Sequence, residues 1–172
     1  MTDADCFLTI AELGERYAAG SARPSSIASL HLERIARIDP KLNAMQVVDV
    51  DGALQAAQES DARWAAGRPA GPLDGITVTI KDNVDIAGFP TRHGSLTTPD
   101  VPATADSPVV ARLREAGAVI LGKTRLPEFG WKGLTDGPLQ GGPTRNPWNT
   151  ATSPGGSSGG GSPSVSAGLR TS

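Results

Sequence analysis

The sequence predicts an α/β protein in which a β-sheet is layered with helices, and three neighbouring segments lead to this prediction. From Gly75 the residues GITVTIK alternate apolar and polar side chains, which is the two-residue period of a β-strand with one buried face. A helix is expected to begin at Ser107-Pro108 and to end near Gly117, since a cap followed by proline favours a helix start and glycine favours a helix end. The apolar run AVIL at 118–121 is typical of a strand that is covered on both faces.

The rest of the chain consists of a helical first part and an irregular last part. Helices are expected over 8–19, from Pro24 to the residue before Pro40 and over 51–66, with a strand over 44–50. After Thr124 the sequence is rich in glycine and proline and has no clear period. Long ordered loops of this kind tend to be functional, so this segment is expected to carry part of a site.

Charge and composition exclude several classes of function. The 172 residues include 16 basic and 18 acidic residues without a run of like charge, so neither nucleic acid nor a membrane surface is expected as a partner. No continuous apolar segment near the N-terminus resembles a signal peptide or a membrane span. The single Cys6 allows no internal disulfide, which suits a cytoplasmic protein, and Cys6, His31 and His93 offer no metal site.

The stretch Gly117–Thr124, GAVILGKT, matches the phosphate-binding pattern G-x-x-x-x-G-K-[ST]. That pattern works as a glycine-rich loop between a strand and a helix, where free backbone N–H groups point at the phosphate. Here the four middle residues are strand formers, a helix is expected before them, and Leu126-Pro127 discourages a helix after them. A buried strand with a glycine at each end explains the stretch better, and nucleotide binding is kept as an alternative.

Lys81, in TIKDN, lies on the polar face of the strand expected from Gly75. A solvated side chain is the ordinary interpretation of a lysine. Burial, however, lowers the pKa of a lysine amine, and a neutral amine can act as a base near neutral pH. Lys81 is therefore a candidate catalytic base that needs a hydroxyl group as its partner.

The stretch GGSSGGGS at 155–162 can supply that hydroxyl group, although its composition is also that of a flexible linker. A linker joins two folded parts, whereas few residues follow this stretch, and Trp148 and the proline turns before it indicate docked backbone. Glycines beside a serine allow backbone conformations that a Cβ atom would forbid, so the hydroxyl group can be aimed. We therefore favour a functional role for this serine pair over a linker.

Three segments resemble, in order and spacing, the N-terminal part of the amidase signature enzymes: GPLDGITVTIKDNVDIAGFPTRHGS, DSPVVARLREAGAVILGKTRLPEFG and GGPTRNPWNTATSPGGSSGGGSPSVSAGL. The resemblance covers about residues 71–169 and implies a mixed β-sheet flanked by helices, incomplete in this chain. It divides the chain into a helical lead-in at 1–70 and the first part of the amidase signature core at 71–172, which is truncated before the nucleophile.

The resemblance implies hydrolysis of carboxamide C–N bonds by acyl transfer through a Ser, cis-Ser and Lys triad. Lys81 is then the buried base, and Ser157 is the bridging serine, whose preceding peptide bond is cis in the family. Neutral Lys81 takes a proton from Ser157, Ser157 takes one from the nucleophilic serine, and the same path returns a proton to the leaving amine. Ser158 is expected to help by hydrogen bonding. No metal or cofactor is implied, and the expected partner is a small-molecule amide.

The chain also departs from the family pattern. The nucleophilic serine and the glycine-rich oxyanion hole lie further along in the family, so the 172-residue chain alone is expected to be an inactive fragment. Arg125 stands where the family often has asparagine, and Pro163 falls where a helix usually runs, which is expected to loosen the support of Ser157. An alternative function is that of a truncated remnant that binds another chain through an exposed sheet edge.

Overall fold

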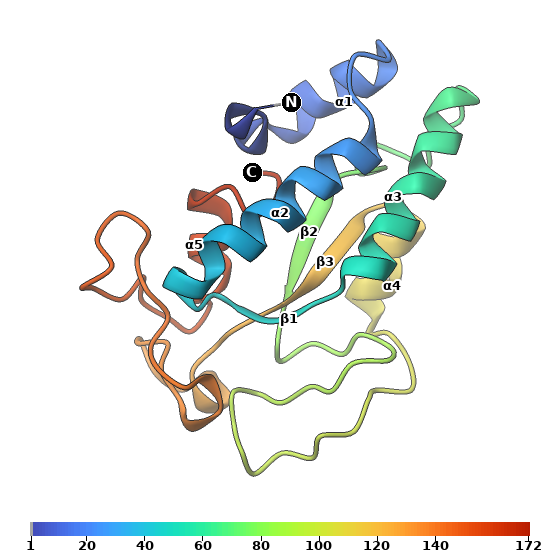
Figure 1. Ribbon diagram of the computed structural model, residues 1–172. Helices are drawn as coiled ribbons and strands as arrows, with labels where there is room; N and C mark the ends of the chain where they lie inside the picture. Colours follow the sequence, from blue (N-terminus) through green and yellow to red (C-terminus); the bar gives the residue numbers. More distant parts are fainter. Residues whose placement is uncertain (1) are drawn as a thin grey trace.

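The computed structural model describes residues 2–172 and forms a small β-sheet with helices on both sides (Figure 1). In chain order the helices and strands are α1 (Ile10–Ala18), α2 (Pro24–Leu42), β1 (Met45–Val48), α3 (Val50–Ala65), β2 (Thr77–Lys81), α4 (Pro108–Glu115), β3 (Val119–Thr124) and α5 (Gly161–Ser166). Short 3-10 helices are η1 (Asp3–Phe7), η2 (Glu128–Gly130) and η3 (Pro138–Gln140). The α/β class expected from the sequence is confirmed.

β3 is the central strand of the sheet, whose order is β1-β3-β2. It pairs antiparallel with β1 and parallel with β2, so the sheet is mixed. Every residue of β3 is buried, which confirms the interpretation of the AVIL run as a strand covered on both faces. The parallel pairing places Lys81 opposite Thr124. The carboxyl ends of β2 and β3 therefore meet at one edge, where open α/β sheets commonly carry their sites.

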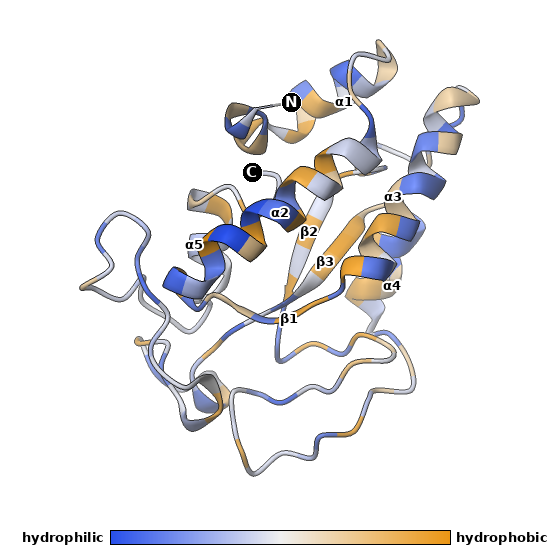
Figure 2. Ribbon diagram, in the orientation of Figure 1, coloured by the Kyte–Doolittle hydropathy of each residue, from blue (hydrophilic) through white to orange (hydrophobic). Residues whose placement is uncertain are grey.

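The two faces of the sheet are covered by different helices, because alternate residues of β3 point to opposite faces. α2 and α3 pack with Val119 and Leu121 in one buried cluster. α4 contributes Val110 to a second cluster with Ile80 and Ile120 on the other face. In Figure 2 the first half of β3 is coloured as hydrophobic, as expected for the residues shared between these clusters. Within residues 2–172 none of the helices combines the length and apolar character that a membrane span requires.

β2 differs from the expectation of one buried and one solvated face. Ile80 is buried as expected, but Thr77, which belongs to the polar face, is fully buried as well. The Thr77 hydroxyl group lies within hydrogen-bonding distance of His31 Nδ1 on α2 and of Thr171. These bonds satisfy the polar group without water. The polar face of β2 is thus packed against α2 and the end of the chain.

α2 does not end before Pro40, as the sequence predicted, but continues through it to Leu42. A proline removes one intrahelical hydrogen bond, and at this point the helix tolerates that loss. The helix ends instead at Asn43, whose left-handed conformation (φ 55°) breaks the repeat. The carboxylate of Asp39 then accepts a hydrogen bond from the backbone of Met45, which directs the chain into β1.

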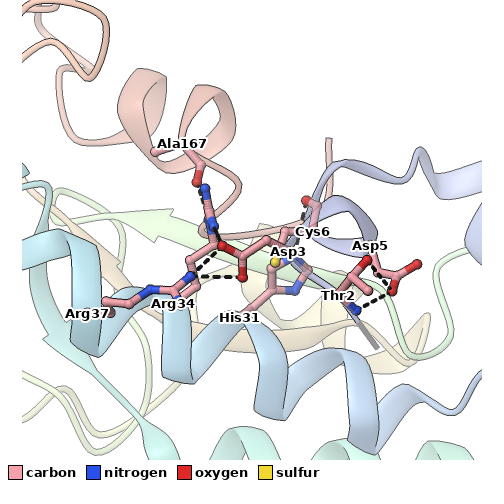
Figure 3. Close-up of polar contacts among 8 residues, drawn as sticks. All are labelled: Thr2, Asp3, Asp5, Cys6, His31, Arg34, Arg37 and Ala167. Atoms are coloured by element: carbon pink, nitrogen blue, oxygen red, sulfur yellow. Dashed lines mark hydrogen bonds and ion pairs between the residues drawn. The ribbon is translucent and has the colours of Figure 1, made fainter.

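The N-terminal helix η1 is tied to α2 and to the segment after α5 by a group of polar contacts (Figure 3). Asp3 accepts hydrogen bonds from Arg34 and Arg37 of α2. Arg34 also donates from Nε to the carbonyl oxygen of Ala167 at 2.6 Å, and its guanidinium group lies 5.2 Å from the centre of the Phe7 ring. Through Arg34, η1 is therefore linked to the segment that follows the serine-rich loop, which is the GGSSGGGS stretch at 155–162.

His31 is fully buried beneath η1, and we expect it to make the fold sensitive to acid (Figure 3). Its Nε2 lies 3.4 Å from the carbonyl oxygen of Cys6, and its Nδ1 lies 3.0 Å from the Thr77 hydroxyl group. Burial lowers the pKa of His31 from 6.5 to about 4, because desolvation disfavours the imidazolium ion. Below pH 6.5 the unfolded chain binds a proton that the folded chain does not. The free energy of unfolding should therefore fall by about 3 kcal/mol as the pH drops toward 4.

Urea unfolding at a series of pH values measures this loss. The variant His31→Gln has no titrating group at this position, so its free energy of unfolding should vary with pH by about 3 kcal/mol less over the same range. His93→Gln is the matched control, because His93 is the other histidine of the chain and is only half-buried. An identical pH dependence in the wild type and in His31→Gln would contradict the prediction.

Candidate active site

Lys81 is the last residue of β2, and its side chain reaches from the end of the sheet to the serine-rich loop. Its Nζ atom donates hydrogen bonds to Ser157 Oγ at 2.9 Å and to Ser158 Oγ at 3.1 Å. Lys81 is half-buried rather than enclosed, and this burial lowers the pKa of its amine below the usual value, since desolvation disfavours the ammonium ion. The structure thus brings together the three candidate residues of the sequence.

The serine-rich loop is packed backbone, not a free linker. The peptide bond between Gly156 and Ser157 is cis. A Cβ atom on Gly156 would lie 2.7 Å from the carbonyl oxygen of Lys132, so the loop lies directly against the backbone of that segment. Ser157 is half-buried and Ser158 is exposed. These contacts exclude the linker alternative and leave both hydroxyl groups on the side of Lys81.

Thr135 contacts this loop at two glycines and is not apparent from the sequence. It is fully buried, and its Oγ1 donates to the carbonyl oxygen of Gly155 at 3.0 Å. A Cβ atom on Gly159 would clash with the Thr135 side chain. One threonine therefore fixes the backbone on both sides of the serine pair. The only signal in the sequence is a β-branched residue within a segment rich in glycine.

The start of α5 is tied to the ends of two strands. The backbone N–H of Gly160 donates to the carbonyl oxygen of Arg125 at 3.0 Å, and the N–H of Arg125 donates to Ala44 at 2.9 Å. Pro163 lies in the first turn of α5 and does not interrupt it, contrary to the expectation from the sequence. A proline in the first turn removes only a donor that has no partner inside the helix. The support of the serine pair from α5 is therefore intact.

Lys123, the lysine of the GAVILGKT stretch, is not available to a phosphate group. It belongs to β3 instead of a glycine-rich loop, and it is fully buried. Its Nζ atom lies 2.8 Å from each of three acceptors, which are Asp82 Oδ1, the carbonyl oxygen of Pro90 and Thr91 Oγ1. These acceptors use all three donors of an ammonium group. The nucleotide-binding alternative is therefore wrong.

The chemistry available at this site is proton transfer. A half-buried amine with two hydroxyl groups at hydrogen-bonding distance can take up a proton and pass it on.

Among residues 2–172 no group of three or more His, Cys, Asp or Glu side chains is placed to hold a metal ion. A cavity of about 530 Å³ lies between α1, α2 and α3, lined in part by Tyr17 and Trp64, and it does not include Lys81 or Ser157.

Known proteins resemble this chain over nearly its whole length. The family model Amidase matches residues 27–171. A glutamyl-tRNA(Gln) amidotransferase subunit of Salinispora tropica is 42% identical over 167 residues, which are 97% of this chain and 34% of that protein. The acylamidase of Rhodococcus erythropolis is 40% identical over 163 residues, with 95% and 34% covered. The structure of peptide amidase from Stenotrophomonas maltophilia superposes with a TM-score of 0.86 and 37% identity, over 94% of this chain and 34% of that chain.

The chain spans about a third of the length of the relatives that it matches. Over that third, the superposition supports the mixed sheet and flanking helices described above, and the family model and the sequence identity indicate the same family. The chain belongs to the amidase family, the amidase signature enzymes.

Proposed function

We propose that this chain carries the proton-transfer half of an active site that hydrolyses carboxamide C–N bonds by acyl transfer. The observation that supports the proposal most directly is the 2.9 Å contact between Lys81 Nζ and Ser157 Oγ. An amine whose pKa is lowered by burial can accept a proton through such a contact. Membership of the amidase family supports the same chemistry.

In the proposed mechanism Lys81 is the base and Ser157 is the bridge. The uncharged Lys81 amine accepts the Ser157 hydroxyl proton, and Ser157 accepts the proton of a nucleophilic serine as that oxygen attacks the amide carbon. The C–N bond then breaks, and the proton held by Lys81 returns through Ser157 to the leaving amine. Water attacks the resulting ester through the same relay and releases the carboxylic acid. Ser158 supports Lys81 through its hydrogen bond at 3.1 Å.

The nucleophilic serine of this mechanism is proposed to lie outside the 172 residues. Two serines follow the pair closely, but Ser164 is fully buried and its hydroxyl group donates to the carbonyl oxygen of Gly161. Ser162 is exposed and lies one residue into α5. Neither serine shares a hydrogen bond with Lys81 in the part of the chain that the structure describes.

We therefore expect the 172-residue chain alone to hydrolyse no amide above the buffer rate. A panel of small alkyl and aryl amides, followed by the release of ammonia or arylamine, measures this. Lys41→Ala is a matched control for Lys81→Ala, because Lys41 is exposed. Turnover that persists in Lys41→Ala but disappears in Lys81→Ala would refute the expectation, and it would mean that Ser162 or another serine of this chain acts as the nucleophile.

The proposed substrate is a small-molecule amide, and neither nucleic acid nor a membrane is proposed as a partner. With a formal net charge of −2, the chain has no excess of basic residues that would attract a polyanion. We also propose a cytoplasmic location. The only cysteine of the sequence, Cys6, is buried as a free thiol, and a chain without disulfides suits a reducing compartment.

A further inference from the structure

The serine pair lies within a short part of the serine-rich loop, residues 155–159, whose two ends meet at Thr135. Thr135 Oγ1 donates to the carbonyl oxygen of Gly155 at 3.0 Å. A Cβ atom on Gly159 would meet the Thr135 side chain and would lie 2.7 Å from that same carbonyl oxygen. The backbone of Gly159 therefore lies beside that of Gly155, and Thr135 contacts both. The mechanism above does not use Thr135.

Thr135 is itself anchored to the end of α2 through Thr144. Both threonines are fully buried. The backbone N–H of Thr144 donates to the carbonyl oxygen of Thr135 at 2.8 Å, and Thr144 Oγ1 donates to the carbonyl oxygen of Asn43 at 2.7 Å. Asn43 is the residue that caps α2. A line of hydrogen bonds therefore runs from the end of α2 to the backbone that precedes Ser157.

The loop needs such a contact, because its own residues do not select one conformation. Residues 155, 156 and 159–161 are all glycines, and glycine adopts many backbone conformations with little difference in energy. Gly155 has a φ of 91°, which residues with a side chain rarely adopt. A contact from outside the loop must therefore hold the backbone in the conformation that the structure shows.

The position of this backbone decides whether Lys81 has its partners. Ser157 Oγ and Ser158 Oγ lie 2.9 and 3.1 Å from Lys81 Nζ. A displacement of about 1 Å away from Lys81 would break both hydrogen bonds, and a proton passes between such groups only at hydrogen-bonding distance. It would also admit water to the amine.

We propose that Thr135 is a positioning residue for the Lys81–Ser157 pair, because its hydroxyl group joins the two ends of the 155–159 segment and so holds the serine hydroxyl groups against the Lys81 amine. The inference rests on the proposed function, since it matters only where Lys81 acts as a base. It gives a role in the reaction to a buried threonine that does not contact the reacting groups.

The test is the ionisation midpoint of Lys81 in the folded 172-residue chain. It is obtained from the rate of amine acylation at each pH, resolved by residue with mass spectrometry, with exposed Lys41 as the internal reference. Thr135→Val replaces the hydroxyl group by a methyl group of similar size and removes the donor to Gly155. The Lys81 midpoint, which burial places below that of Lys41, should then rise toward it. Thr135→Ser keeps the hydroxyl group and should keep the wild-type midpoint.

A role in stability alone predicts a different result, so urea unfolding of the same variants accompanies the titration. Ser60→Ala is the matched control, because Ser60 is fully buried on α3 and its hydroxyl group donates to Asp74 Oδ1 at 2.6 Å. Ser60→Ala should lose stability and keep the wild-type Lys81 midpoint. A Thr135→Val chain that behaves in the same way would overturn the inference.

Thr135→Ala replaces Thr135→Val if the valine variant does not fold, and it is compared with Thr135→Ser, from which it differs by one hydroxyl group. If neither Thr135→Val nor Thr135→Ala folds, the hydroxyl group supports the whole fold and not the serine pair, and the inference is wrong. A raised midpoint in Thr135→Ser would also contradict it. A wild-type midpoint equal to that of Lys41 would instead contradict the proposed function.

Discussion

Lys81→Ala is expected to lower kcat/KM by a factor of about 10² to 10⁴ when the chain is completed by the C-terminal part of a relative. The acylamidase of Rhodococcus erythropolis is a suitable partner, because this chain matches 34% of it at 40% identity. In the chimera the 172 residues replace that matched part, and the amide substrates of the acylamidase serve as the assay. The loss follows from the removal of the only amine that contacts Ser157 Oγ among the described residues.

Three further variants make this result specific to proton transfer. Ser157→Ala should cost as much as Lys81→Ala, because each breaks the same relay. Ser158→Ala should cost less, since its contact with Lys81 is the longer one, at 3.1 Å, and Ser158 is exposed. Lys41→Ala should leave kcat/KM unchanged. A folded, active chimera that keeps its activity in Lys81→Ala would rule out Lys81 as the base.

The pH profile of the chimera provides a second readout. Lys81 must be uncharged to accept a proton, so kcat/KM should rise with pH and level off above the Lys81 midpoint. Because burial lowers the pKa of Lys81, this plateau should begin below the ordinary lysine range. A rise that begins only where exposed lysines titrate would contradict the proposal.

Gly160→Ala is expected to lower the free energy of unfolding by about 3 kcal/mol. A Cβ atom on Gly160 would meet backbone on several sides: the carbonyl oxygen of Ala44, the nitrogen of Arg125 at 2.5 Å and the carbonyl oxygen of Arg125 at 2.8 Å. Backbone atoms cannot rotate away, so the start of α5 must move. Because Ser157 and Ser158 come just before it, their contacts with Lys81 should be lost as well.

Gly161→Ala is the matched control for this variant. The nearest atom to a Cβ on Gly161 is Ser158 Cβ at 3.9 Å, which is an ordinary contact, and alanine is a better helix former than glycine at the start of α5. Its free energy of unfolding should therefore equal or exceed that of the wild type. Urea unfolding of both variants makes the comparison, and an equal stability of Gly160→Ala and Gly161→Ala would contradict the packing described here.

Local patterns in the sequence account for most of the elements. The alternation after Gly75, the proline start before α4 and the apolar run of β3 each predict an element that the structure contains. Pro40 predicts the end of α2 at the preceding residue, whereas the helix continues to Leu42 and is capped by Asn43. The difference arises because a left-handed residue and the hydrogen bonds of Asp39 end this helix, and the proline signal reveals neither of them.

The candidate active site is likewise only partly predictable from the sequence. Lys81, Ser157 and Ser158 are recognisable from residue type and motif, whereas Thr135 carries no motif. Lys123 carries a motif that points to the wrong chemistry, because the pattern of letters does not record that its stretch is a buried strand.

The sequence by itself determined the succession of helices and strands along the chain. It also determined the residue types that can transfer a proton. Only the tertiary structure decided that the Lys81 amine lies 2.9 Å from Ser157 and that Lys123 faces Asp82. The physical reason is that these contacts join residues far apart in the chain. They exist only when the parallel pairing of β2 with β3 and the packing of the glycine-rich loop bring their backbones together.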